Sequence, residues 1–139
     1  MTTSLFIAKP DTILKEVNHI MERENIHHVP VVDETNEFKG IISKSDIHIL
    51  MDWGTKKDLP ESKRKNNFLL TSNLARDLMT TSVIGVDPED TVEKCVQLFR
   101  ENYFHAIPVV DRRGILVGLV TTYDLLMLAY HPQFALNIS

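Results

Sequence analysis

The sequence predicts a mixed α/β (α+β) protein built from two similar units, each running strand, helix, strand, strand, helix. The segment VPVVD at residues 29–33 recurs as IPVVD at residues 107–111. The same offset of 78 positions holds without a gap between residues 10–50 and residues 88–128, and it aligns prolines, glycines and acids. Within each copy, apolar residues recur first at helical and then at strand spacing. Together these observations predict a β-α-β-β-α unit that occurs twice.

Each copy opens with a predicted strand and a predicted helix. The apolar stretches at residues 4–8 and 82–86 end near a proline and predict short strands. Apolar residues then recur at spacings of three and four, which predicts one helix in each copy. The apolar face of this helix carries Leu14, Val17, Ile20 and Met21 in the first copy, and Val92, Cys95, Val96, Phe99 and Tyr103 in the second.

Two further strands and a second helix complete each copy. Residues 29–32 and 107–110 are rich in β-branched side chains and predict buried strands. The turn after each strand contains a residue that tolerates a left-handed backbone, Asn36 or Gly114. Each copy then continues with a third strand and with a second helix that begins at the next hydroxyl residue: residues 38–42 and Ser43, and residues 115–120 and Thr121.

The start of the second helix has the pattern of a capping box. The sequences GIISKSD and GLVTTYD place a hydroxyl residue three positions before an aspartate, and an apolar run follows. The hydroxyl can accept a hydrogen bond from a backbone N–H of the first turn, and the acid can bond back to the N–H of the cap residue. Ser43 with Asp46, and Thr121 with Asp124, are therefore predicted caps. The open question is whether they also bind a ligand.

The chain is predicted to divide into three parts. Residues 1–53 form the first copy, residues 54–72 a charged linker, and residues 73–139 the second copy. The linker contains a glycine and a proline and shows no apolar periodicity, which is typical of a solvated connection. The alternative is a basic arm that reaches toward phosphates with Lys63, Arg64 and Lys65.

Composition and charge argue against several classes of function. A net charge of −4 gives no general attraction to nucleic acid or to an anionic membrane surface. No apolar run approaches the roughly 20 residues needed to span a bilayer. The single cysteine, Cys95, forms no internal disulfide, which favours a cytoplasmic location. Its place on the apolar face of a helix predicts a packing residue and not a nucleophile.

These repeated motifs resemble a tandem pair of CBS domains, also called a Bateman module. The resemblance covers nearly the whole chain and is carried by ARDLMTTSVIGVDPEDTVEKC, HAIPVVDRRGILVGLVTTYDLL and HHVPVVDETNEFKGIISKSDIHIL. It implies two repeats that pack about a pseudo-two-fold axis, with two clefts between them. It also implies a regulatory module that binds an adenosine-containing ligand such as AMP, ADP, ATP or S-adenosylmethionine, signals to an effector protein, and associates into a homodimer.

The predicted caps carry the chemistry needed to hold the sugar of such a ligand. An ionised carboxylate can accept hydrogen bonds from both hydroxyls of a ribose, so Asp46 and Asp124 are the candidate ribose-binding residues. Ser43 and Thr121 can donate to sugar or phosphate oxygens at a helix start, where anions are favoured.

The two candidate sites differ in one charge. Lys44 follows Ser43, whereas Thr122 occupies the matching position in the second copy. The sequence therefore predicts that the site at Asp46 suits more highly charged nucleotides.

The adenine base is predicted to lie against the residues around each repeated proline. Backbone N–H and C=O groups there can bond the edge of the base, while apolar side chains hold its faces. The resemblance adds the lead-in residues near Thr3 and Thr81. It also marks Ile13 as a departure, because the second copy has Thr91 there, the commoner family choice. The candidates are His27, His28, Val29 and Pro30 in the first copy, and His105, Ala106, Ile107 and Pro108 in the second.

The residues leave alternatives open. The caps can be purely structural, and the module can be a ligand-free scaffold for protein interaction or dimerisation. A metal site at His27 and His105 is a further alternative, but no Cys cluster or HExxH motif accompanies them, so no metal is expected. No GxSxG, P-loop or GxGxxG motif occurs, so neither catalysis nor a required cofactor is expected. Apolar residues on the last helix of each copy serve either the core or a homodimer face.

Overall fold

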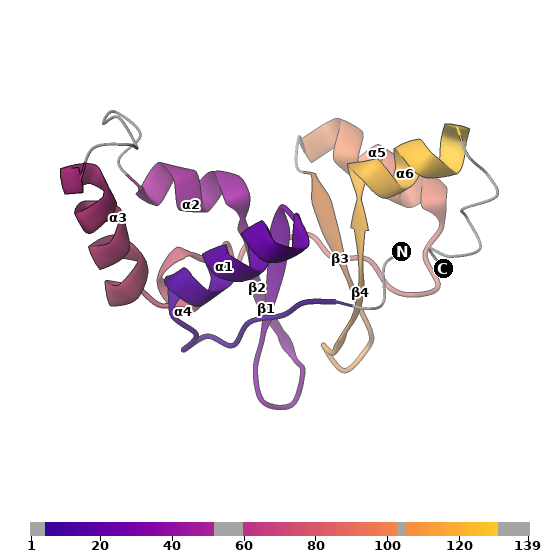
Figure 1. The fold of residues 1–139 in the computed structure, drawn as a ribbon. Coiled ribbons are helices and arrows are strands. Elements are labelled where there is room, and N and C mark those ends of the chain that lie inside the picture. The colour runs from indigo at the N-terminus through magenta and orange to yellow at the C-terminus, as the bar shows by residue number, and fades with distance from the viewer. Residues whose placement is uncertain (1–4, 52–59, 103–104, 131–139) are drawn as a thin grey trace. The chain divides into compact units, whose positions relative to one another are not determined.

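The computed structural model describes residues 5–51, 60–102 and 105–130. These residues form two compact units (Figure 1). The described residues of 6–34 and 39–82 make up the first unit, and Leu5 together with those of 35–38 and 83–130 makes up the second. Both units combine helices with a two-stranded antiparallel hairpin, so the predicted mixed fold class is confirmed.

The first unit packs its helices around one hairpin. Strands β1 (His28–Val32) and β2 (Phe38–Ser43) form the hairpin, and β2 runs directly into α2 (Lys44–Leu50). Helix α1 (Leu14–Glu24) contacts β1, α2 and α3 (Pro60–Ser72), and the short helix α4 (Ala75–Leu78) follows. The core is apolar and fully buried at most positions, and it includes Leu14, Val17, Met21, Val29, Val31, Ile42, Ile47 and Ala75.

The second unit repeats part of this arrangement. Strands β3 (Ala106–Val110) and β4 (Leu116–Thr121) pair in antiparallel register, and a bulge falls between Val109 and Val110. Helix α5 (Val92–Asn102) precedes the hairpin, and α6 (Thr122–Tyr130) follows it without a break. Its core is smaller and consists of Val86, Cys95, Ile107, Val109 and Val120.

The strands predicted before the first proline of each copy are much shorter than expected. Within residues 5–8 and 82–86, only Ala8 and Val86 pair, each through a single parallel bridge to β1 or β3. The chain turns immediately afterwards, because the backbone N–H of Lys9 is bonded to Thr12 and that of Asp87 to Asp90. A strand cannot continue through such a turn, so the ladder ends at one residue.

The hairpin turns use the residues that the sequence singles out. Asn36 has φ of 66° and Gly114 has φ of 84°, and both values lie in the left-handed region. Around Gly114, the carboxylate of Asp111 accepts the backbone N–H of Arg113 at 2.8 Å and of Ile115 at 3.0 Å. These bonds hold the pKa of Asp111 below its usual range.

The helix α5 buries less of its apolar face than the periodicity predicts. Cys95 is buried at 6% exposure, which confirms its predicted packing role, and Phe99 packs against the same core. Val92 and Val96 are each 47% exposed. Tyr103, expected on the same face, lies outside the described residues.

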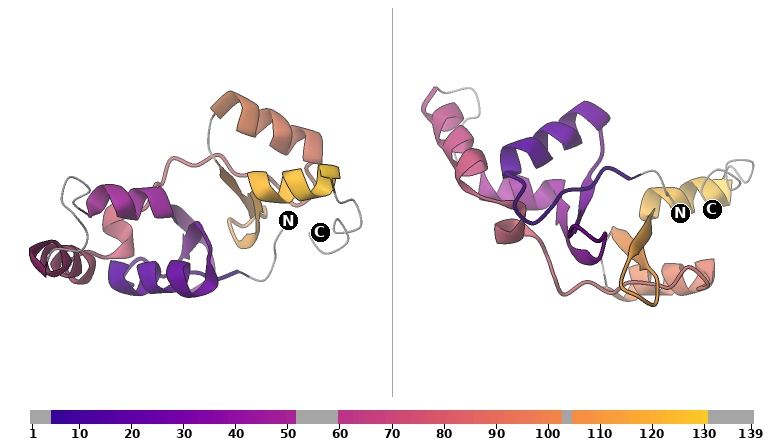
Figure 2. Two further views of the ribbon diagram at one scale, coloured as in Figure 1. Left: turned by 45° about the horizontal axis from the view of Figure 1, so that its top comes forward. Right: turned by 90° about the horizontal axis from the view of Figure 1, so that it is seen from below.

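The predicted linker is largely helical. Helix α3 covers residues 60–72 and lies against α1 (Figure 2). Leu70 of α3 is 8% exposed and belongs to the core of the first unit. Residues 73–82 also belong to the first unit, although the sequence assigns them to the second copy. Leu70 is the buried apolar residue that α3 contributes to this core, and the rest of the segment is rich in charge. The sequence therefore showed no apolar periodicity that would predict a packed helix. No helix among the described residues is long and apolar enough to cross a membrane.

Candidate functional site

The predicted capping box at Ser43 is present in the structure. The Ser43 Oγ accepts the backbone N–H of Asp46 at 3.1 Å, and Asp46 Oδ2 accepts the backbone N–H of Ser43 at 3.0 Å. Ser43 ends β2 in an extended conformation, so its side chain faces the first turn of α2. Both side chains are half-buried, which keeps them fixed but accessible.

The second unit repeats this arrangement at Thr121. The Thr121 Oγ1 accepts the backbone N–H of Asp124 at 3.1 Å, and Asp124 Oδ2 accepts the backbone N–H of Thr121 at 2.9 Å. In both boxes the bonded hydroxyl acts as an acceptor, and its own O–H remains a donor. A carboxylate has about four lone-pair positions. Capping therefore leaves each aspartate able to accept further hydrogen bonds.

Each cap is tied to the segment predicted to bind the base. The backbone N–H of Lys44 donates to the carbonyl of His27 at 2.8 Å. In the second unit, the N–H of Thr122 donates to the carbonyl of His105 at 3.1 Å. Two segments that lie 16 or 17 residues apart in the chain thus meet at the start of a helix in each unit. The structure brings together the predicted sugar-binding and base-binding residues of each copy.

The apolar candidates for the base pocket are buried, and Val29 and Ile107 belong to the cores of the two units. Val29, Pro30, Ile107 and Pro108 are all less than 2% exposed, and Ala106 is 5% exposed. The prediction that these side chains hold the faces of the base stays untested, and their burial leaves little of each side chain exposed.

Backbone direction narrows the base-binding candidates further. The carbonyls of Pro30 and Pro108 accept the N–H groups of Ala8 and Val86 at 3.0 Å, so both are already bonded. Alternate residues of a strand direct their backbone groups to the same edge. His28 and Ala106 lie two residues before these prolines, so their backbone groups face the same strand edge as the bonded carbonyls. The imidazoles of His27 and His105 are exposed.

Thr81 lies in the first unit, beside β2. The preceding residue, Thr80, exchanges two backbone hydrogen bonds with Ile41, at 2.9 and 3.1 Å. A Cβ on Gly40 would lie 2.9 Å from the Thr80 carbonyl oxygen and 2.9 Å from Met79 Sδ. Only glycine allows this approach. The sequence aligned Gly40 with Gly118 but did not indicate this contact. Thr3, the counterpart of Thr81, lies outside the described residues.

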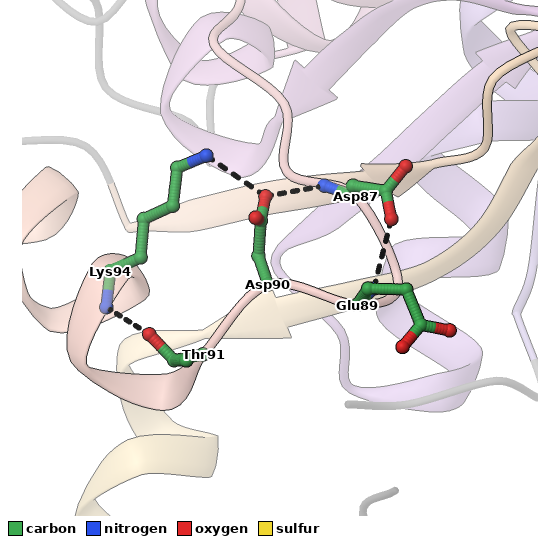
Figure 3. Close-up of polar contacts among 5 residues, drawn as sticks. All are labelled: Asp87, Glu89, Asp90, Thr91 and Lys94. Carbon is green, nitrogen blue, oxygen red and sulfur yellow. Dashed lines mark hydrogen bonds and ion pairs between the residues drawn. The ribbon is translucent and has the colours of Figure 1, made fainter.

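The first helix of each copy is capped differently. Ile13 is the N-cap residue of α1 and makes no side-chain cap bond. At the same position in the second unit, Thr91 Oγ1 accepts the N–H of Lys94 at 3.2 Å (Figure 3). Asp90 Oδ2 accepts the N–H of Asp87 at 2.8 Å and pairs with Lys94 Nζ at 3.0 Å. These bonds lower the pKa of Asp90, the backbone bond most strongly.

Charge distinguishes the two caps. Lys44 is half-buried next to Ser43, and no ion pair joins it to another described residue. Thr122 is exposed at the matching position and carries no charge. A phosphate near the first cap would therefore meet an ammonium group that forms no ion pair with a described carboxylate.

Neither a metal-binding cluster nor an activated cysteine is found in the part of the chain that the structure describes. No group of three His, Cys, Asp or Glu side chains that could hold a metal occurs among these residues. Burial raises the pKa of the Cys95 thiol above its usual value, which disfavours the reactive thiolate.

Comparison with known proteins places this geometry in a family. The family described as CBS domain matches residues 1–51 and 75–131. A CBS domain-containing protein of Dictyostelium discoideum is 30% identical over 126 residues, which cover 91% of this chain and 85% of that protein. The chain also matches an inosine-5'-monophosphate dehydrogenase of Aquifex aeolicus at 29% identity, but it spans only 23% of that enzyme's length.

Solved CBS-pair structures share the fold. The CBS-pair protein CBSX2 of Arabidopsis thaliana, crystallised in complex with AMP, superimposes with a TM-score of 0.77 at 24% identity. That match covers 96% of this chain and 94% of the other. A CBS domain pair crystallised with 5'-methylthioadenosine and S-adenosyl-L-methionine gives a TM-score of 0.73 at 24% identity, over 92% of this chain and 93% of the other.

Proposed function

The chain belongs to the CBS domain family, with two such domains in tandem, and from that premise we propose that it is a regulatory module that binds an adenosine-containing ligand. One observation carries the proposal: each unit ties a half-buried hydroxyl–aspartate cap to the carbonyl of a histidine that precedes a buried strand. Support also comes from two proteins of the same fold, which were crystallised with AMP and with 5'-methylthioadenosine and S-adenosyl-L-methionine.

The aspartates are the proposed ribose ligands. Asp46 and Asp124 each use one carboxylate oxygen for the cap, and the other oxygen can accept from the two sugar hydroxyls. Ser43 and Thr121 already accept a backbone bond, so their O–H groups are the donors for a sugar or phosphate oxygen. The cap serves binding because it fixes the acid before the ligand arrives.

The base is proposed to bond to the backbone of the strand that begins each hairpin. Ala8 and Val86 each bridge to one edge of β1 or β3, and the backbones of His28 and Ala106 face that same edge two residues before the bonded prolines. Thr81 and the exposed rings of His27 and His105 are the remaining side-chain candidates on this side. Placement of the ligand in clefts between the repeats stays a prediction of the family resemblance.

The first site is proposed to prefer phosphorylated ligands. Lys44 supplies a positive charge that Thr122 cannot supply, and a charged hydrogen bond contributes about 1.5–3 kcal/mol. AMP should therefore bind the first site more tightly than 5'-methylthioadenosine, which has no phosphate. Isothermal titration of both ligands into Lys44→Met tests this difference: AMP should lose affinity while 5'-methylthioadenosine does not. Equal losses for the two ligands would contradict the role of Lys44.

Ligand binding itself is tested by thermal unfolding with AMP, ADP, ATP, S-adenosylmethionine and NADH. A ligand that binds only the native state raises the unfolding midpoint. Asp46→Asn and Asp124→Asn form a matched pair, because asparagine retains an oxygen that can accept the cap bond but lacks the charge. Loss of the charge should weaken the two ribose bonds by about 1 kcal/mol each, or affinity by roughly 30-fold. If no compound shifts the midpoint at millimolar concentration, the ligand proposal fails.

The second candidate function is a scaffold whose sites stay empty. It is favoured by exposed apolar side chains on the last helix of each copy, namely Ile49 on α2 and Tyr123, Leu126 and Tyr130 on α6. The same side chains are the proposed homodimer face or the face for an effector protein. Sedimentation of the chain with and without ligand separates these roles from ligand sensing. Neither function requires catalysis, and a cytoplasmic location remains part of the proposal.

A further inference from the structure

The connection that leads into the second repeat is built into the first unit. We call residues 73–80 the strap. At its start, the N–H of Leu14 donates to the carbonyl of Asn73 at 3.0 Å, and the N–H of Ala75 donates to the carbonyl of Thr12 at 2.7 Å. Ile13 and Leu74 pair as an antiparallel bridge. The backbone of the strap therefore bonds to the start of α1, where Ile13 provides no side-chain cap.

The end of the strap binds the edge of β2. Thr80 exchanges two backbone hydrogen bonds with Ile41, which lies two residues before Ser43 on the same strand. Gly40 permits this pairing, because a Cβ there would meet the Thr80 carbonyl oxygen at 2.9 Å. Between the two ends, the side chain of Ala75 is fully buried in the core of the first unit. The strap thus spans from the start of α1 to the strand that delivers the first cap.

The corresponding helix of the second unit does not depend on such a segment for its cap. Thr91 Oγ1 accepts a backbone N–H in the first turn of α5, that of Lys94, and Asp90 Oδ2 accepts the N–H of Asp87 in the turn before the helix (Figure 3). The first copy has Ile13 where the second copy has Thr91, and there the backbone of the strap bonds to the start of the helix. An uncapped helix start leaves N–H groups that need other acceptors, and the carbonyl of Asn73 in the strap accepts one of them, the N–H of Leu14.

We propose that Gly40 and the strap position the first ligand site, and that occupancy of this site locks the Thr80–Ile41 pair. The inference rests on the proposed function, in which Asp46 after β2 contacts the ligand, and it adds that Thr81, which follows the strap in the same unit, contacts that ligand too. A ligand that bonds to residues on both sides of the pair must leave before the pair can open. Occupancy of the first site then stabilises the segment that continues into the second repeat. Gly40 is a positioning residue, since it touches the strap and not the ligand.

Amide exchange measures this coupling directly. If the pair opens only after the ligand leaves, exchange at Thr80 and Ile41 slows by the factor 1 + [L]/Kd, about 100-fold at a ligand concentration 100 times Kd. Hydrogen–deuterium exchange of the full chain should be followed by NMR with and without AMP. At the same ligand concentration the slowing should persist in Asp124→Asn and fall to about fourfold in Asp46→Asn, because only the latter removes the charge from the first site and weakens binding there roughly 30-fold.

A second variant tests the strap without any ligand. Gly40→Ala places a methyl group against the Thr80 carbonyl, so exchange at Thr80 and Ile41 should accelerate at least tenfold in the free protein, and AMP affinity at the first site should fall. Gly85→Ala is the matched control, because its Cβ would lie 3.3 Å from the carbonyl of Pro108 in the second unit. It should leave exchange at Thr80 and Ile41 unchanged.

The outcomes separate this inference from the proposed function. If AMP raises the unfolding midpoint but leaves exchange at Thr80 and Ile41 unchanged, ligand binding stands and the strap coupling is wrong. If Gly40→Ala leaves both amides as protected as in the wild type, the positioning role of Gly40 is wrong whatever binds. If Gly40→Ala accelerates exchange but no adenosine compound binds, the proposed function fails and the coupling fails with it.

Discussion

Substitution of Ser43 by alanine measures how much the first cap contributes to the free energy of unfolding, apart from any role in ligand binding. The change removes the Oγ that accepts the Asp46 N–H at 3.1 Å, while the carboxylate of Asp46 keeps its bond to the backbone of residue 43. The cap is only half-buried, so water can bond the freed N–H and the full cost of an unpaired buried group does not arise. We therefore expect a loss of about 1 kcal/mol in the free energy of unfolding.

Packing of α2 against the core limits the loss in the free energy of unfolding to that of the cap. Helix α2 has seven residues, and Ile47 in its second turn is fully buried in the core. Packing therefore holds the helix after its cap is lost, and α2 should stay folded. A loss of about 1 kcal/mol corresponds to a fall of about 4 °C in the unfolding midpoint.

Equilibrium urea unfolding, followed by circular dichroism without ligand, measures the loss. Ser45→Ala is the matched control, because Ser45 lies on the same helix and is exposed. Alanine at that position should be neutral or slightly stabilising. Thr121→Ala should repeat the loss in the second unit. A Ser43→Ala variant as stable as Ser45→Ala would refute the cap, and a loss above about 3 kcal/mol would show that the helix depends on more than this bond.

Two further predictions concern the second unit. The pKa of Asp90 is lowered from 3.8, so its bonds contribute stability above about pH 4 that is lost as pH falls through the lower folded value. Asp90→Asn should therefore destabilise the chain most above pH 5, and the difference should shrink toward pH 2; urea midpoints that differ equally at all pH values would contradict this. Native Cys95 should react with a thiol reagent far more slowly than the urea-unfolded chain, because it is buried and its thiol pKa is raised.

Much of the fold follows from local patterns. The β-branched runs form β1 and β3, and Asn36 and Gly114 adopt the left-handed conformations that hairpin turns require. Both capping boxes form with all four expected hydrogen bonds. These features depend on residues within about four positions of one another, so one sequence is sufficient to predict them.

Burial was predicted for some residues and not for others. The β-branched runs predicted that Val29 and Ile107 are buried, and both are fully buried in their cores, whereas their place in a base pocket stays a prediction. The sequence also placed Val92 and Val96 on the apolar face of a helix, and each remains 47% exposed. A strand or helix pattern shows which residues share a face. It does not show which neighbours cover that face, because those neighbours come from distant parts of the chain.

The sequence by itself determined the duplication, the order of elements and the two caps, because a repeat and a cap are written in residue identities and short spacings. Only the tertiary structure decided that residues 73–82 belong to the first unit, and that Gly40 lies against Thr80. Those contacts join segments about 40 to 60 residues apart in the chain. They depend on how backbone groups pair in space, which carries no signature in the order of the side chains.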